Sequence, residues 1–164
     1  MVENFLYAAF ASANTVKFRE KSIELGELYL KNQKWKKFRA DVTFIMCNAY
    51  RLQADTLRKE AASLQTAMST IDKERAARAK EQSAEYYQRF FSLCDDFLNV
   101  MPEHKYAKDF VNMMGAVYFS NRRFDDLLQK FAGYENGEMD TSKGFVNTEA
   151  FKNSPANTRC FWRT

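Results

Sequence analysis

The segment "KNQKWKKFR", residues 31–39, has the residue types best suited to binding chemistry. Five basic residues flank two aromatic residues, with no acidic residue among them: Lys31, Lys34, Lys36, Lys37 and Arg39, around Trp35 and Phe38. Basic residues interleaved with aromatic ones can hold a phosphate backbone and stack on bases, or can meet an acidic protein surface. A solvated basic rim is the simplest interpretation, because the net charge is only +4.

Groups that could perform catalysis are sparse. The single histidine, His104, has no nucleophile or orienting acid at a helical spacing, so we expect an exposed residue near a helix start. The sequence contains no Glu-x-x-His pair, no G-x-x-x-x-G-K-[ST] loop and no G-x-G-x-x-G loop. We therefore expect a non-enzyme with no catalytic residue, no metal site, no cofactor and no small-molecule substrate.

The three cysteines, Cys47, Cys94 and Cys160, are far apart and odd in number. This pattern disfavours both a zinc site and a disulfide framework, and it indicates a reduced intracellular compartment. No apolar run approaches the roughly 20 residues that a membrane span needs. Glu3 occupies the region where a secretory signal carries positive charge, so we expect no such signal, although a presequence removed before Met1 would leave no trace.

The composition favours helices, because 5 Gly and 2 Pro in 164 residues provide too few turns for a sandwich or barrel. Apolar residues at helical spacing predict an all-α domain over residues 1–133, with helices over 3–14, 17–31, 35–68 with a break near residue 69, 71–100, 103–119 and 122–132. Residues 71–85 have few large apolar side chains, which suits an exposed arm or the tip of a helical hairpin. Residues 134–164 are predicted to form an extended C-terminal tail.

Two stretches of the sequence repeat one phrase: "LGELYLKNQKWKKF", residues 25–38, and "MGAVYFSNRRFDDL", residues 114–127. A glycine within a helix costs roughly 1 kcal/mol relative to alanine, so it indicates that another helix packs closely there. The following tyrosine is expected to fill the gap, the asparagine to close the helix in a left-handed conformation, and the next aromatic residue to start the partner helix on its buried side. The predicted hairpin-packing residues are Gly26, Tyr29, Trp35, Phe38, Gly115, Tyr118, Phe124 and Leu127.

This phrase resembles the helix–turn–helix of tetratricopeptide repeats and, more loosely, of pentatricopeptide repeats. A second period supports the resemblance, because Phe90, Cys94 and Phe97 recur 34 residues later as Phe124, Leu128 and Phe131. The resemblance covers residues 17–50 and 84–132, and residues 51–83 interrupt it. It implies antiparallel helical hairpins stacked in an irregular, repeat-like array that binds proteins. The alternative is an irregular helical bundle in which two turns are similar by chance.

The hairpin phrase, the small size, the basic character and the tail together are also similar to a narrower family. This is the pentatricopeptide-like accessory subunit of the mitochondrial ATP synthase catalytic head in euglenozoan protists. The resemblance implies a non-catalytic protein that lies inside mitochondria, binds the outside of an ATP synthase subunit and carries no nucleotide of its own.

The tail contains four large aromatic residues without periodicity: Phe145, Phe151, Phe161 and Trp162. They cannot form a core of their own, and their exposure would favour aggregation, so we expect them to dock on the helices or in a neighbouring subunit. The sequence thus predicts a non-catalytic accessory or scaffold subunit of a larger protein complex. The partner-binding candidates are Lys34, Lys36, Lys37, Arg39 and the four tail aromatics. The alternative is an RNA-associated protein that uses residues 31–39, although two or three irregular hairpins are too few to read RNA sequence.

Overall fold

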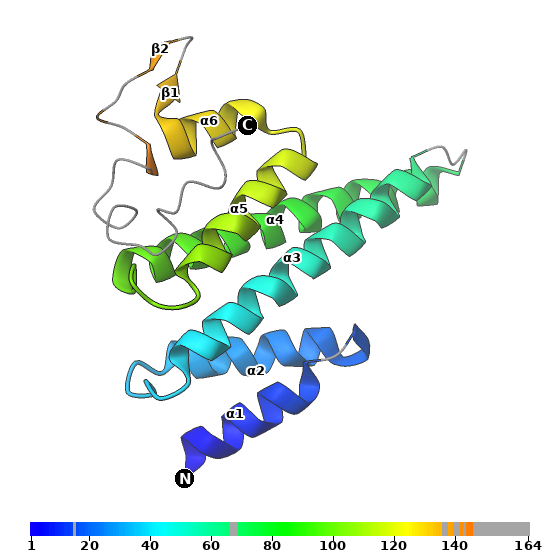
Figure 1. Cartoon of the computed structure of the whole chain (residues 1–164). Helices are drawn as coiled ribbons and strands as arrows, with labels where there is room; N and C mark the ends of the chain where they lie inside the picture. The colour runs from blue at the N-terminus through cyan, green and yellow to red at the C-terminus, as the bar shows by residue number, and fades with distance from the viewer. Residues whose placement is uncertain (15, 66–68, 136–137, 140–141, 143, 146–164) are drawn as a thin grey trace. The chain divides into compact units, whose positions relative to one another are not determined.

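A computed structural model describes residues 1–14, 16–65, 69–135, 138–139, 142 and 144–145 (Figure 1). Within these residues, six α-helices follow one another: α1 (Val2–Ala13), α2 (Arg19–Lys31), α3 (Arg39–Leu64), α4 (Thr70–Val100), α5 (Ala107–Ser120) and α6 (Phe124–Ala132). A short 3-10 helix, η1 (Val16–Phe18), precedes α2. The strands β1 (Tyr134–Glu135) and β2 (Glu138–Met139) form a minimal antiparallel pair. The predicted all-α class is confirmed.

The chain divides into two compact units, Met1–Leu93 and Cys94–Thr164, with the division inside α4. The boundary predicted after residue 133, between the helices and the C-terminal tail, stays a prediction. Long amphipathic helices can contribute to two units in succession, because different stretches of one helix can bury their apolar faces in different places.

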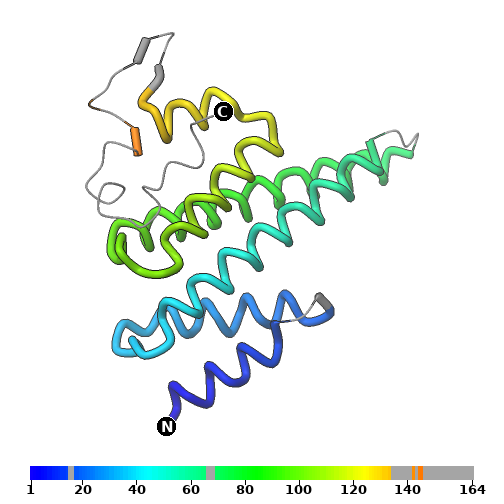
Figure 2. The backbone as a smooth tube through the Cα atoms, in the orientation of Figure 1, coloured from blue at the N-terminus to red at the C-terminus, as the bar shows by residue number. Residues whose placement is uncertain are grey.

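The N-terminal unit contains α1, α2, α3 and the first part of α4. Side chains at helical spacing form its core; Phe10, Tyr29, Val42, Met46, Cys47 and Ala54 are fully buried. The helices α3 and α4 run side by side in opposite directions (Figure 2), since Ser83 donates to the carbonyl of Ala54 while Arg75 pairs with Glu60 further along α3. The helix α3 ends at Leu64 and α4 begins at Thr70, close to the break predicted near residue 69.

Tyrosine–carboxylate hydrogen bonds join each successive pair of helices in this unit. Tyr29 on α2 donates to Glu3 on α1. Tyr50 on α3 donates to Glu27 on α2 over 2.8 Å. Tyr87 on α4 donates to Asp55 on α3 over 2.5 Å. Each bond places a polar group of one helix at a defined position on its neighbour, so the bonds specify how the helices align along their axes.

The C-terminal unit contains the end of α4, then α5 and α6. Phe97 of α4 packs against Phe110 of α5 with 4.1 Å between ring centroids, and Lys130 of α6 forms a 2.7 Å ion pair with Asp95 of α4. The helix α6 ends at Gly133, whose left-handed backbone (φ 74°) lets its N–H return to the carbonyl of Gln129. None of the helices described is both long and apolar enough to cross a membrane.

Candidate interaction surface

The segment between α2 and α3, which we call the basic turn (residues 31–39), is anchored by the start of α1. The Glu3 carboxylate accepts hydrogen bonds from the Tyr29 hydroxyl and from the Lys37 N–H, the latter over 2.9 Å. The Tyr29 oxygen in turn accepts the Phe38 N–H over 3.1 Å. Burial, followed by donation to Glu3, raises the pKa of Tyr29 to about 12. The phenol therefore stays neutral and holds the turn throughout the physiological pH range.

The basic turn also packs against aromatic rings of α1 and α2. Phe38 stacks on Tyr7 of α1 with 4.1 Å between ring centroids and 5° between ring planes. Trp35 lies 5.5 Å from the Tyr29 ring, and both Trp35 and Phe38 are half-buried. The backbone of the basic turn is thus held by hydrogen bonds and by ring contacts together.

The basic side chains of this turn fall into two groups. Lys31, Lys34 and Lys36 are exposed, and each side chain lacks a hydrogen bond or ion pair to any residue that the structure describes. Lys37 lies with its Nζ 4.8 Å from the Phe38 ring centroid and 3.4 Å from Asn4 Oδ1. Arg39 is half-buried and donates to the Leu30 carbonyl over 3.0 Å. Three ammonium groups are therefore available to an anionic partner, while Arg39 closes the end of α2.

The two copies of the repeated phrase adopt different turns. In the first copy, the turn between α2 and α3 spans seven residues, 32–38. In the second copy, the turn between α5 and α6 is shorter and spans residues 121–123. Trp35 was predicted to start a helix, but α3 begins at Arg39, because hydrogen bonds from Lys37 and Phe38 to side chains replace helical ones. Phe124 does start a helix, yet it is 48% exposed rather than buried. Its ring contacts the exposed Phe119.

The asparagines of the two turns are not left-handed, as the sequence predicted them to be. Asn32 has a φ of −89° and Asn121 a φ of −92°; each side chain instead bonds locally, Asn32 Oδ1 to the Lys34 N–H and Asn121 Nδ2 to the Val117 carbonyl. The left-handed residue is Arg122, with a φ of 56°.

The glycines and tyrosines of the phrase are buried in both copies. A Cβ at Gly26 would lie 2.7 Å from Met46 Cγ on α3 and 2.9 Å from Phe10 Cε2 on α1, so two neighbouring helices pack against this position. Gly115 and Tyr118 are buried in the C-terminal unit, and Leu127 is half-buried. Burial raises the pKa of Tyr118 to about 12.

Of the tail aromatics, Phe145 is buried and packs edge-on against Phe131 of α6, with 5.8 Å between ring centroids. Close approach of the backbone makes this contact possible, because a Cβ at Gly144 (φ 90°) would lie within 2.6 Å of the Ala132 carbonyl carbon. Phe151, Phe161 and Trp162 lie outside the described residues.

No catalytic constellation is visible in the part of the chain that the structure describes. His104 is half-buried rather than exposed; its ring packs edge-on against Phe97, and its Nδ1 accepts the Tyr106 N–H over 3.3 Å. The described His, Cys, Asp and Glu side chains form no group of three that could hold a metal ion. Cys47 and Cys94 are buried and form no disulfide with a described residue, and Cys160 lies outside the described residues.

The tyrosine–carboxylate bonds were not foreseen from the sequence. Their partners are 26, 23 and 32 residues apart, so no fixed spacing connects them. Only the packing of the helices shows which tyrosine meets which carboxylate.

No family model matches the chain, and searches of curated proteins and of solved structures give no significant match.

Proposed function

We propose that the protein is a non-catalytic accessory or scaffold subunit that binds an acidic surface of a partner protein through its basic turn. The observation that carries the proposal is the set of three exposed ammonium groups, on Lys31, Lys34 and Lys36, that have no partner within the described residues. They lie on a backbone held by Glu3 and Tyr29. A fixed backbone reduces the ordering cost of binding, and positive charge attracts an acidic surface.

A narrower form of this proposal is that the chain is a tetratricopeptide- or pentatricopeptide-like protein that decorates a mitochondrial ATP synthase. The sequence resemblance described above is its support. This narrower proposal includes a larger complex, a mitochondrial location and a protein partner.

Native co-purification tests the proposed function. The variant Lys34→Glu/Lys36→Glu reverses two exposed charges of the basic turn and is expected to lose a stoichiometric, nuclease-resistant protein partner. The matched control Lys73→Glu/Lys80→Glu makes the same charge change on exposed residues of α4 and is expected to retain it. Equal recovery of the partner with both variants would contradict the proposed role of the basic turn.

One observation favours RNA as a second candidate partner. The half-buried Trp35 ring lies among exposed lysines, and a base could stack on such a ring while the lysines bind phosphate. In this case association would be nuclease-sensitive, and mixed-sequence RNA would bind at physiological salt with an affinity that falls steeply as salt rises. Absence of such binding would eliminate this candidate.

A further inference from the structure

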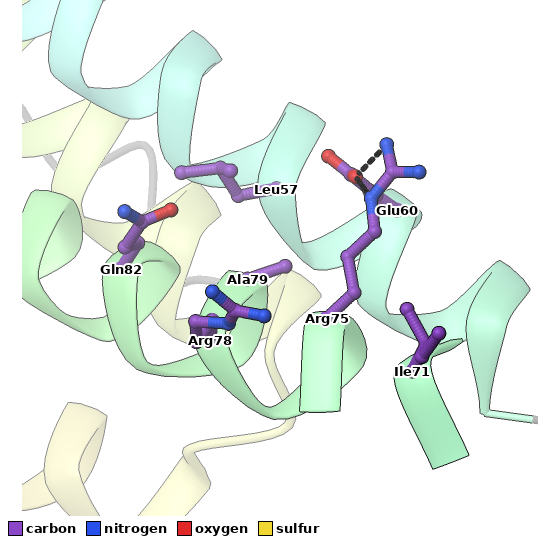
Figure 3. Close-up of a pocket in the computed structure, with 7 residues that line it drawn as sticks. All are labelled: Leu57, Glu60, Ile71, Arg75, Arg78, Ala79 and Gln82. Carbon is purple, nitrogen blue, oxygen red and sulfur yellow. Dashed lines mark hydrogen bonds and ion pairs between the residues drawn. The ribbon is translucent and has the colours of Figure 1, made fainter. Parts of the chain in front are cut away.

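A groove between α3 and α4 opens on one side of the N-terminal unit, and we call it the distal groove (Figure 3). It encloses about 390 Å³ and is lined by Leu57, Glu60, Ile71, Arg75, Arg78, Ala79 and Gln82. Ala79 is buried and Leu57 half-buried, whereas Ile71 is 73% exposed. The groove therefore combines three apolar side chains with four polar ones, from Glu60, Arg75, Arg78 and Gln82.

The chain already places a helix against the same side of α3 and α4, beside the distal groove. Glu27 of α2 contacts both Tyr50 of α3 and Arg89 of α4, over 2.8 and 3.0 Å. The first residue of α2, Arg19, hydrogen-bonds to Gln53 and Thr56 of α3. The helix α2 begins at Arg19, and Leu57 and Glu60 lie one helical turn further along α3 than Gln53 and Thr56. The distal groove is thus a continuation of the surface that α2 covers.

A change of residue size explains why the groove is open. Where α2 packs, Tyr50 and Tyr86 lie 6.0 Å apart by ring centroids and fill the space between α3 and α4. Two helical turns away, at the positions that repeat every seven residues, the residues are Leu57 and Ala79. Smaller side chains at equivalent positions leave room for side chains of another helix.

The charged side chains of the groove indicate which charge an occupant should carry. Arg75 is neutralised by Glu60, with Nη2 2.6 Å from the carboxylate (Figure 3). The Arg78 guanidinium makes no hydrogen bond or ion pair with any residue that the structure describes. On the α2 side, the Arg89 guanidinium donates to the Glu27 carboxylate over 3.0 Å, and both side chains are partly exposed. An occupant with an acidic residue could use Arg78 in the same way.

We infer that the distal groove binds an amphipathic helix of a partner protein, with apolar residues over Leu57, Ile71 and Ala79 and an acidic residue at Arg78. Helix-in-groove recognition uses this combination of an apolar stripe and a flanking charge. The inference rests on the proposed function, since it concerns the same scaffold. The distal groove is a second surface, and it shares no residue with the basic turn.

Two designed helical peptides test the inference by fluorescence anisotropy. Both have about 18 residues, or five turns, and the same leucine stripe, but one carries glutamates and the other lysines beside that stripe. We expect the acidic peptide to bind at least about tenfold more tightly, which is the effect of one charge-assisted hydrogen bond. Arg78→Glu should reverse this preference, because the new carboxylate repels the glutamates and attracts the lysines, and Ile71→Ser should weaken the binding of both peptides.

Matched controls change the same residue types elsewhere. Lys80→Glu reverses an exposed charge of α4 outside the groove, and Leu28→Ser shortens a 54% exposed leucine of α2. Neither should alter peptide binding. Ile71 is exposed enough that its substitution should leave the melting temperature nearly unchanged. Equal binding of the two peptides, no binding of either, or equal effects of Arg78→Glu and Lys80→Glu would overturn the inference.

Two further measurements identify the occupant and separate the two proposals. Sedimentation that shows a dimer lost with Arg78→Glu would make a second copy the occupant and would overturn the inference. Peptide binding by the Lys34→Glu/Lys36→Glu variant should equal that of the parent. If this variant loses its co-purified partner while binding the peptide normally, both proposals are supported; if it keeps the partner, only the proposed role of the basic turn fails.

Discussion

The phenol of Tyr50 on α3 donates a 2.8 Å hydrogen bond to the carboxylate of Glu27 on α2. Arg89 on α4 reaches the same carboxylate oxygen over 3.0 Å, so three helices meet at one acidic group. Burial, followed by donation to Glu27, raises the pKa of Tyr50. The helices of the N-terminal unit are therefore aligned by directional hydrogen bonds as well as by apolar packing.

Removing the Tyr50 hydroxyl should weaken the N-terminal unit. We expect Tyr50→Phe to lower the free energy of unfolding by about 1 kcal/mol, because the ring stays while one hydrogen bond to a carboxylate is lost. Urea denaturation followed by circular dichroism measures the change. Tyr7→Phe is the matched control, since the Tyr7 hydroxyl makes no hydrogen bond within the described residues. Equal effects of the two substitutions would contradict a stabilising role for the Tyr50–Glu27 bond.

Stability should fall at alkaline pH. The pKa of Tyr29 rises from its ordinary value of 10 to about 12 in the folded protein, chiefly through burial and then through donation to Glu3. A raised folded-state pKa stabilises the protein fully below pH 10 and less as the pH rises through 12. The urea midpoint should therefore decline between these values, by a free energy on the order of 2 kcal/mol for Tyr29.

The variant Tyr29→Phe isolates this contribution. It should be less stable than the parent at pH 8, and its stability should fall less steeply between pH 10 and 12. Some decline should remain, because burial also raises the pKa of Tyr118 to about 12. A parallel decline in parent and variant would show that Tyr29 does not control the alkaline transition.

A methyl group at Gly26 should destabilise the packing of α2 between its neighbours. The added Cβ of Gly26→Ala would come within 2.9 Å of the Phe10 ring and closer to Met46. Overpacking costs about 1–3 kcal/mol, which exceeds the roughly 1 kcal/mol that alanine gains in helix propensity. Thermal melting of Gly26→Ala, Met46→Ala and the double variant tests this. The double variant should lose less stability than the sum of the two single losses.

Relief of backbone strain should stabilise the turn between α5 and α6. Arg122 has a φ of 56°, a left-handed conformation that costs roughly 1–2 kcal/mol for residues with a Cβ. Arg122→Gly should therefore raise the free energy of unfolding by about 0.5–1 kcal/mol, after the entropy cost of glycine in the unfolded chain. Arg122→Ala removes the same side chain but keeps the strain, so it should change stability little. If alanine stabilises as much as glycine, the gain comes from losing the arginine and not from the backbone.

The sequence was most informative about helices and their buried sides. Apolar spacing predicts one buried side for the α3 segment, formed by Phe38, Val42, Ile45, Met46, Ala49 and Leu52. Val42, Met46 and Ala49 are buried, whereas Leu52 is 40% exposed. A helix repeats every 3.6 residues whatever it packs against, so local spacing is sufficient for such predictions. The close packing at Gly26 could also be predicted from the residue type, because a glycine within a helix lowers helix stability relative to alanine.

The basic turn was less predictable. The sequence predicts Lys34, Lys36, Lys37 and Arg39 as one group of partner-binding candidates. In the structure, Arg39 donates to the Leu30 carbonyl and the Lys37 N–H donates to Glu3. Glu3 lies 34 residues before Lys37, and nothing in the sequence between them indicates the contact. The distal groove was also missed, because Leu57 and Ala79 form one site only when α3 and α4 lie side by side.

By itself, the sequence determined that this protein is built from helices, approximately where each helix begins and ends, and which side of each one is apolar. These properties depend on interactions between residues a few positions apart. Tertiary structure alone decided which tyrosine meets which carboxylate, which lysines remain without a partner among the described residues, and where a groove stays open. Those properties depend on contacts between residues far apart in the chain, and helical spacing carries no information about them.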